Sequence, residues 1–167
     1  MIKLIQSMAI ISSIFMSHLL SAEAPSSRTI TENFKDWQLA CVEQNDIKRC
    51  KVSQTLVNEN KAVVSILSVI KQKDNLLMEI TLPHLLNLQV PAKIYVDEQL
   101  INSFAYNFCN QNACYIIIED NAKLFESFRK GKSAYMKMQA IGNRDLKFNF
   151  SLLGFSSALN ALDKKKS

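Results

Sequence analysis

The sequence predicts a mostly β domain, an antiparallel β-sandwich of the immunoglobulin-like class with two short helices, and a β-barrel is the alternative. Two observations predict this class. Apolar and polar residues alternate with a period of two in about nine segments, which recur roughly every 8 to 15 residues. Only two short segments have the 3.6-residue apolar period of a helix. Many short strands with few helices are typical of sandwiches and barrels.

The first two predicted strands form a hairpin. In chain order, the strand segments cover residues 36–42, 50–57, 62–70, 76–82, 92–96, 103–109, 114–119, 134–140 and 146–152. In the first segment, Trp37, Leu39 and Cys41 alternate with Gln38 and Ala40, which is the pattern of a half-buried strand. The second segment alternates similarly, so we expect the two to pair. We also expect the Trp37 ring to pack over a disulfide that includes Cys41.

The two helices are predicted from their apolar faces and their ends. Those faces consist of Leu124, Phe125 and Phe128 in the first helix and of Phe155, Leu159 and Leu162 in the second. Asn121 is placed to cap the first helix, and Gly131 stands where a left-handed C-terminal cap is expected. The second helix follows Gly154, with Ser156 as its expected cap.

The N-terminus has the pattern of a secretory signal. Lys3 precedes an apolar run over 8–15, and small residues at 21–24 offer cleavage after Ala22 or Ala24. Cleavage after Ala22 is favoured because the other site would place Pro25 just past the scissile bond. The alternative is an uncleaved membrane anchor, but polar residues leave no run of about 20 apolar residues.

The chain divides into four predicted parts. Residues 1–22 are the signal peptide, 23–33 a flexible leader, 34–163 a single β-rich domain, and 164–167 a basic tail. Loss of the signal removes Lys3, so the formal charge falls from +5 to +4. The basic residues are not interleaved with aromatic ones as in a nucleic-acid platform, so we expect no nucleic-acid partner. An anionic membrane or envelope surface suits this charge better.

The four cysteines fall in two close pairs. Cys41 and Cys50 flank one turn-like stretch, and Cys109 and Cys114 flank another. An even number of cysteines in an exported chain predicts disulfides, and we expect these local pairs among the three possible pairings. The spacing fits neither a structural zinc site nor a C-x-x-C redox centre.

No catalytic pattern occurs in the sequence. His84, which follows Pro83, lacks a recognisable nucleophile or base beside it, so a periplasmic hydrolase is only a minor alternative. No phosphate loop, zinc-protease or nucleophile-elbow motif is present. We therefore expect no enzyme, no cofactor and no metal. The unusually apolar loop with Leu85, Leu86 and Leu88 either packs under the sheet or contacts a partner. Packing is favoured because soluble monomers rarely expose large apolar patches, and these three leucines are the candidates for partner contact.

An ordered set of short motifs resembles a known family. The pieces are Phe34-x-Asp36-Trp37-x-x-x-Cys41, Cys50-x-x-x-Gln54, Leu82-Pro83 leading to Ile94-Tyr95-Val96-Asp97, the Cys109 and Cys114 pair, Leu124 ahead of Gly131, and Ser151-Leu152-Leu153-Gly154-Phe155 with Ala158-Leu159. Together they resemble the invasion-associated locus B proteins of alphaproteobacteria. The resemblance covers nearly the whole exported chain. It departs from the family pattern at Asn87, Glu98 and Ala113, where members tend to have glycine.

The resemblance implies a periplasmic, outer-membrane-associated or secreted protein linked to virulence, through entry of bacteria into host cells. It supplies no catalytic residues. We expect a non-enzymatic protein with a protein, envelope or host-surface partner. A periplasmic assembly or chaperone-like factor for outer-membrane components is the alternative.

Overall fold

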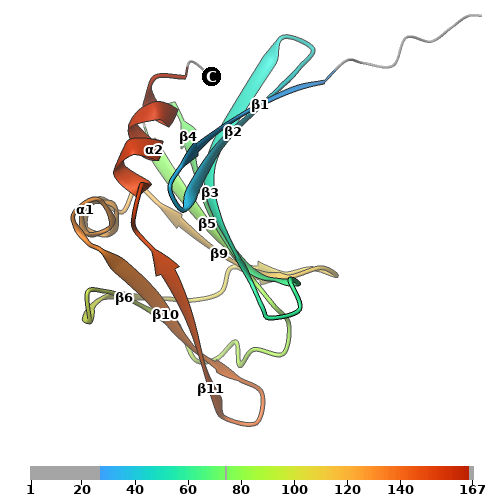
Figure 1. The fold of residues 1–167 in the computed structure, drawn as a ribbon. Helices are drawn as coiled ribbons and strands as arrows, with labels where there is room; N and C mark the ends of the chain where they lie inside the picture. Colours follow the sequence, from blue (N-terminus) through green and yellow to red (C-terminus); the bar gives the residue numbers. More distant parts are fainter. Residues whose placement is uncertain (1–26, 74, 166–167) are drawn as a thin grey trace, which may run out of the picture.

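The computed structural model describes residues 27–73 and 75–165 and has two antiparallel sheets with two helices (Figure 1). The strands are β1 (Arg28–Phe34), β2 (Trp37–Gln44), β3 (Ile47–Val57), β4 (Val63–Gln72), β5 (Asn75–Leu82), β6 (Ala92–Val96), β7 (Gln99–Phe104), β8 (Phe108–Cys109), β9 (Cys114–Glu119), β10 (Ser133–Ala140) and β11 (Arg144–Ser151). The helices are α1 (Ala122–Lys130) and α2 (Phe155–Asp163). The predicted signal peptide lies outside the described residues.

The strands form a seven-stranded sheet and a four-stranded sheet. Their orders are β1-β2-β3-β4-β5-β9-β8 and β11-β10-β6-β7. The sheets are not closed on each other within the described residues, so the predicted β-sandwich is confirmed and the barrel alternative is wrong. None of the described helices is long and apolar enough to cross a membrane.

The core lies on the inner face of the larger sheet, beneath the smaller sheet and the two helices. Across five neighbouring strands of the larger sheet, one residue from each is in register and at most 4% exposed: Leu39, Val52, Val69, Met78 and Ile118. The smaller sheet contributes buried residues by the same alternation along β6 and β10. Because side chains alternate across a strand, a shift of one residue in register would expose this whole row.

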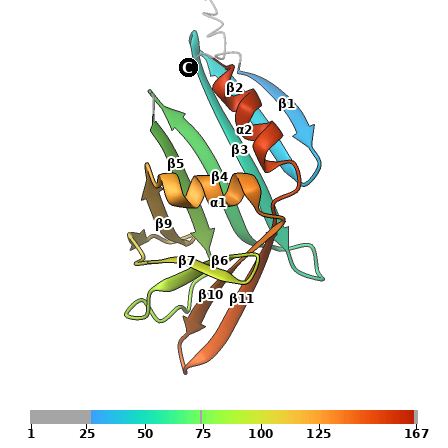
Figure 2. The ribbon, with the colours of Figure 1, turned by 90° about the vertical axis from the view of Figure 1, so that its left-hand side faces the viewer.

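The two helices lie across the face of the larger sheet, beside the smaller sheet (Figure 2). Helix α2 packs on β1 to β4, and α1 packs on α2. The Phe155 ring meets the rings of Trp37 at 4.8 Å and Phe128 at 5.5 Å, both edge to face. Trp37 therefore does not pack over the disulfide as predicted, because Cys41 lies four residues, or about 13 Å, farther along the strand.

Two predicted boundaries are corrected. Residues 28–34 form β1, paired with β2, where the sequence predicted a flexible leader. The predicted strand 103–109 is two strands in different sheets, because β7 pairs with β6 and β8 pairs with β9. Asn107 ends the β8 ladder, since its Oδ1 accepts the Ile117 N–H at 2.7 Å.

The helix ends also differ in part from prediction. Asn121 caps α1 as expected, its Oδ1 accepting the Leu124 N–H at 3.0 Å. Gly131 is not left-handed, with φ −74°, but a Cβ there would lie 2.4 Å from Val96 Cγ1. Gly131 is thus required for close packing. Ser156 does not cap α2, and its Oγ donates to the Arg129 carbonyl.

Candidate functional site

The two disulfides clip neighbouring strands. The structure joins Cys41 to Cys50 and Cys109 to Cys114, the local pairing expected from the spacing. Each pair is directly opposite in its ladder, β2 with β3 and β8 with β9. Because all four cysteines are bonded, no thiol is available as a nucleophile or a metal ligand. Two such disulfides are typical of proteins in oxidising, extracytoplasmic compartments.

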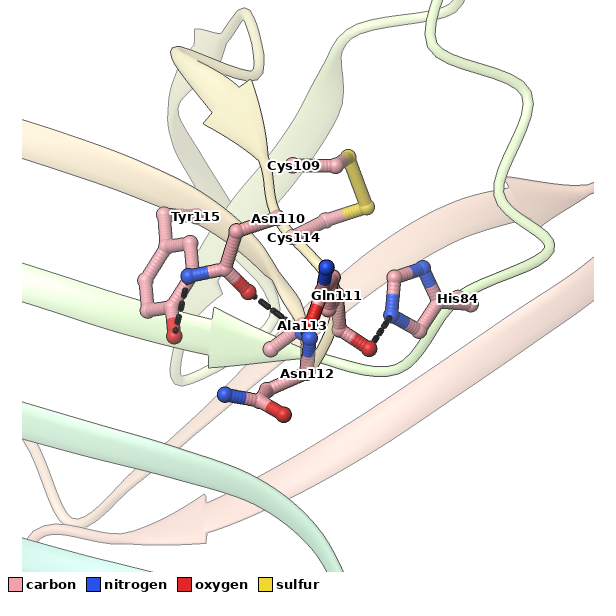
Figure 3. The surroundings of a disulfide bond; sticks show 8 residues. All are labelled: His84, Cys109, Asn110, Gln111, Asn112, Ala113, Cys114 and Tyr115. Carbon is pink, nitrogen blue, oxygen red and sulfur yellow. Dashed lines mark hydrogen bonds between the residues drawn. A yellow bond between two sulfur atoms is a disulfide. The ribbon is translucent and has the colours of Figure 1, made fainter.

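His84 lies beside the second clip (Figure 3). Its Nε2 is 3.3 Å from the backbone carbonyl oxygen of Gln111, and the ring is exposed. The neighbouring turn is held by Asn110, whose Oδ1 accepts the N–H groups of Asn112 at 2.8 Å and Ala113 at 3.1 Å. A backbone carbonyl is neither a nucleophile nor a general base, so this geometry gives His84 a structural contact rather than a catalytic one. The described residues contain no cluster of His, Cys, Asp or Glu suited to a metal ion.

The loop after β5 is tied to the end of β10. Leu86 forms a bridge with Ala140, and the Ile141 N–H donates to the Leu85 carbonyl at 2.9 Å. Asn87 contributes twice, because its N–H donates to the Gln139 carbonyl and its side-chain amide donates to Gln139 Oε1. The loop therefore continues the smaller sheet and is held in a single position.

The loop and the β10–β11 turn expose three large apolar side chains. Leu85 and Ile141 are neighbours through the hydrogen bond between their backbones, and Leu88 follows three residues along the loop. Leu85 is 72% exposed, Ile141 66% and Leu88 51%, and we call these three residues the apolar tip. Figure 1 shows the two segments meeting at the foot of the molecule. Leu85 has φ 68°, a conformation that costs a bulky residue energy and that recurs at functional sites.

The prediction for this loop is partly corrected. Leu86 was a candidate for partner contact together with Leu85 and Leu88, but it is 5% exposed and packs in the core, as the packing alternative predicts for the loop. The bridge to β10 explains this, since it pairs Leu86 with Ala140, whose side chain also points into the core. Sequence analysis missed Ile141, whose signal was an isolated apolar residue between Ala140 and the turn-forming Gly142.

The comparisons with known proteins agree with the fold. The family model described as Invasion associated locus B (IalB) protein matches residues 37–163. The chain is similar to the crystal structure of invasion associated protein B from Bartonella henselae, with a TM-score of 0.72 and 26% identity over 80% of this chain and 95% of that one. No curated protein matches. The family match spans most of the chain, including both disulfides, and the chain belongs to the invasion-associated locus B family.

Proposed function

We propose that this protein is exported to the periplasm, outer membrane or exterior and supports association with host cells by binding a partner through the apolar tip. The observation that supports this most directly is the exposure of Leu85, Leu88 and Ile141 at one end of the smaller sheet. Soluble proteins rarely expose grouped apolar side chains without a partner. Membership of an invasion-associated family supports the host-cell setting.

The energetics of the tip suit a contact with a partner. Fully burying one leucine or isoleucine side chain contributes about 1.5 to 3 kcal/mol, so three provide the core of a small interface. Binding energy in interfaces is concentrated in a few such central residues. The hydrogen bonds from Asn87 to Gln139 hold the loop before binding, which lowers the entropic cost of association.

The available chemistry favours binding over catalysis. All four cysteines are bonded, and the hydrogen-bond partner of His84 is a backbone carbonyl. A hydrolase acting through His84 would need a nucleophile or carboxylate within hydrogen-bond reach of the ring. We accordingly assign a non-enzymatic role to the protein.

A host-cell assay tests the proposal. Bacteria producing the Leu85→Asn, Ile141→Ser variant should associate with and enter cultured host cells less than wild type. Asparagine is chosen at position 85 because it tolerates positive φ. The matched control is Val57→Thr, Val63→Thr, a cross-strand pair of similar exposure, 54% and 59%, away from the tip.

Two outcomes decide between the candidate roles. Unchanged entry by the tip variant, at equal protein level in the envelope, would contradict a role of the tip in host association. Cross-linking from position 88 in intact bacteria then identifies the partner class. Capture of an outer-membrane component under assembly would favour a periplasmic assembly factor, and capture of a host-surface component would favour direct association.

A further inference from the structure

Three lysines face solvent side by side on the smaller sheet. Lys93 in β6, Lys137 in β10 and Lys147 in β11 are directly opposite one another in the two ladders, and all three are exposed. We call them the lysine row. Like charges directly opposite on neighbouring strands destabilise a sheet, and none of the three forms an ion pair within the described residues. Because an anionic partner would relieve the repulsion among the three ammonium groups, the lysine row is suited to bind one.

Two tyrosines in the adjacent row support the lysines. The rings of Tyr95 and Tyr135 stack with centroids 4.7 Å apart and planes 11° apart. The Lys147 Nζ lies 3.9 Å from the Tyr135 centroid, and the Lys137 Nζ lies 5.5 Å from that of Tyr95. Cation–π contacts keep these ammonium groups on the surface without neutralising their charge. The Tyr135 hydroxyl donates a hydrogen bond to Glu98 Oε2 at 2.9 Å.

The lysine row and the apolar tip share one face of the sheet. Alternation along β10 places Lys137 and Gln139 outward, and Gln139 bonds the side chain of Asn87. Ile141, four residues beyond Lys137, is about 13 Å farther toward the tip. The face of the four-stranded sheet (Figure 2) therefore changes in order from aromatic rings to ammonium groups, then to amides with the Asp145 carboxylate opposite Gln139, then to exposed apolar side chains. Three lysines outweigh this one carboxylate.

We propose that this face binds a bilayer surface rich in anionic phospholipid. The apolar tip enters the boundary between headgroups and acyl chains, and the lysine row pairs with lipid phosphates. Interfacial segments insert about 5 to 10 Å, which brings long lysine side chains some 13 Å above the tip to the phosphate level. A soluble polyanion would pair with the lysines but leave Leu85 and Ile141 in water. This inference rests on the proposed function and names the partner of the tip.

Vesicle cosedimentation of the purified full chain tests the inference. The probes are phosphatidylcholine vesicles with and without about 30% phosphatidylglycerol, at low and high salt. The row variant is Lys93→Gln, Lys137→Gln, Lys147→Gln. The matched control, Lys48→Gln, Arg49→Gln, Lys51→Gln, removes the same number of charges from β3 in the other sheet. Circular dichroism verifies that each variant is folded.

The expected result separates the two surfaces. Wild type and the β3 control should bind the anionic vesicles and not the neutral ones. Each lysine near an anionic surface strengthens binding about fivefold, so the row variant should bind about 100-fold more weakly. The Leu85→Asn, Ile141→Ser variant should also bind more weakly, and this loss should persist at high salt because it is apolar in origin.

Three results would overturn the inference. They are equal binding of wild type to neutral and anionic vesicles, an equal loss in the β3 control, and row-dependent binding to a sulfated polysaccharide without binding to vesicles. The last would assign the row to a soluble polyanion. These outcomes leave the proposed function standing if the tip variant still reduces host-cell entry, so the two failures are distinguishable.

Discussion

Replacing Gly154 by alanine tests the close contact between the segment that connects β11 to α2 and the hairpin of β1 and β2. Gly154 has φ 94°, and a Cβ there would lie 1.9 Å from the Phe34 carbonyl oxygen. Because the obstructing atom belongs to the backbone, no side-chain rotation can relieve the contact. The β1–β2 connection would have to move away from α2, and with it Trp37, whose ring packs on Phe155.

Gly142 is the matched control for this substitution. It has φ 81°, and nothing lies within 4 Å of its ideal Cβ. Alanine at either position incurs the cost of left-handed backbone, about 1 to 2 kcal/mol. Only Gly154→Ala adds a displaced contact, which we set at about 1 to 3 kcal/mol by analogy with overpacked cores. Gly154→Ala should thus destabilise by about 2 kcal/mol more than Gly142→Ala.

Urea unfolding with both disulfides intact measures this difference. With a slope of about 2 kcal/mol per molar urea, the Gly154→Ala midpoint should lie about 1 M below that of Gly142→Ala. The slopes themselves should be equal if the unfolding remains two-state. Equal midpoints for the two variants would refute the reasoning, because they would show that the Phe34 carbonyl can move away from the new methyl group with no loss of stability.

Further predictions concern a buried amide, a carboxylate and a disulfide. Gln54 is 6% exposed, and its side chain forms hydrogen bonds with the Asp36 carbonyl and with both the N–H and the carbonyl of Ser151. Gln54→Leu should therefore lower the free energy of unfolding in urea by about 2 to 3 kcal/mol. The control Gln38→Leu, at an exposed position, should change it little. Backbone N–H groups of Ser133 and Lys132 hold the pKa of Asp97 below its ordinary value. Its stabilising contribution is therefore present above that ordinary value and is lost as pH falls from there through the folded-state pKa. Asp97→Asn should flatten the dependence of the urea midpoint on pH between about pH 5 and 2, and an unaltered curve would contradict this. Replacing both Cys41 and Cys50 by serine removes the disulfide that closes a loop of sequence separation 9. The free energy of unfolding should fall by about 2.5 kcal/mol, because the denatured chain gains conformational entropy. An unchanged free energy would contradict this entropic account.

Local patterns in the sequence predicted the elements that depend on near neighbours. The alternation of Trp37, Leu39 and Cys41 predicted the inner face of β2, and Asn121 predicted the start of α1, where it accepts the Leu124 N–H. The close cysteine spacing predicted the two local disulfides for the same reason. In each case the decisive interaction joins residues a few positions apart, so the pattern is complete within a short window.

The tertiary structure alone decided how distant segments are paired. Alternation could not show that the chain changes sheets between β7 and β8, because both strands have the same period. Nor could it bring Ile141 beside Leu85, or align Lys93 with Lys137 and Lys147.

These neighbours depend on strand register, which is set by hydrogen bonds and core packing between segments far apart in the chain. The sequence by itself therefore determined a disulfide-linked β-sandwich with an apolar loop, and its prediction of export stays a prediction. The fold determined which of its exposed side chains form a common surface.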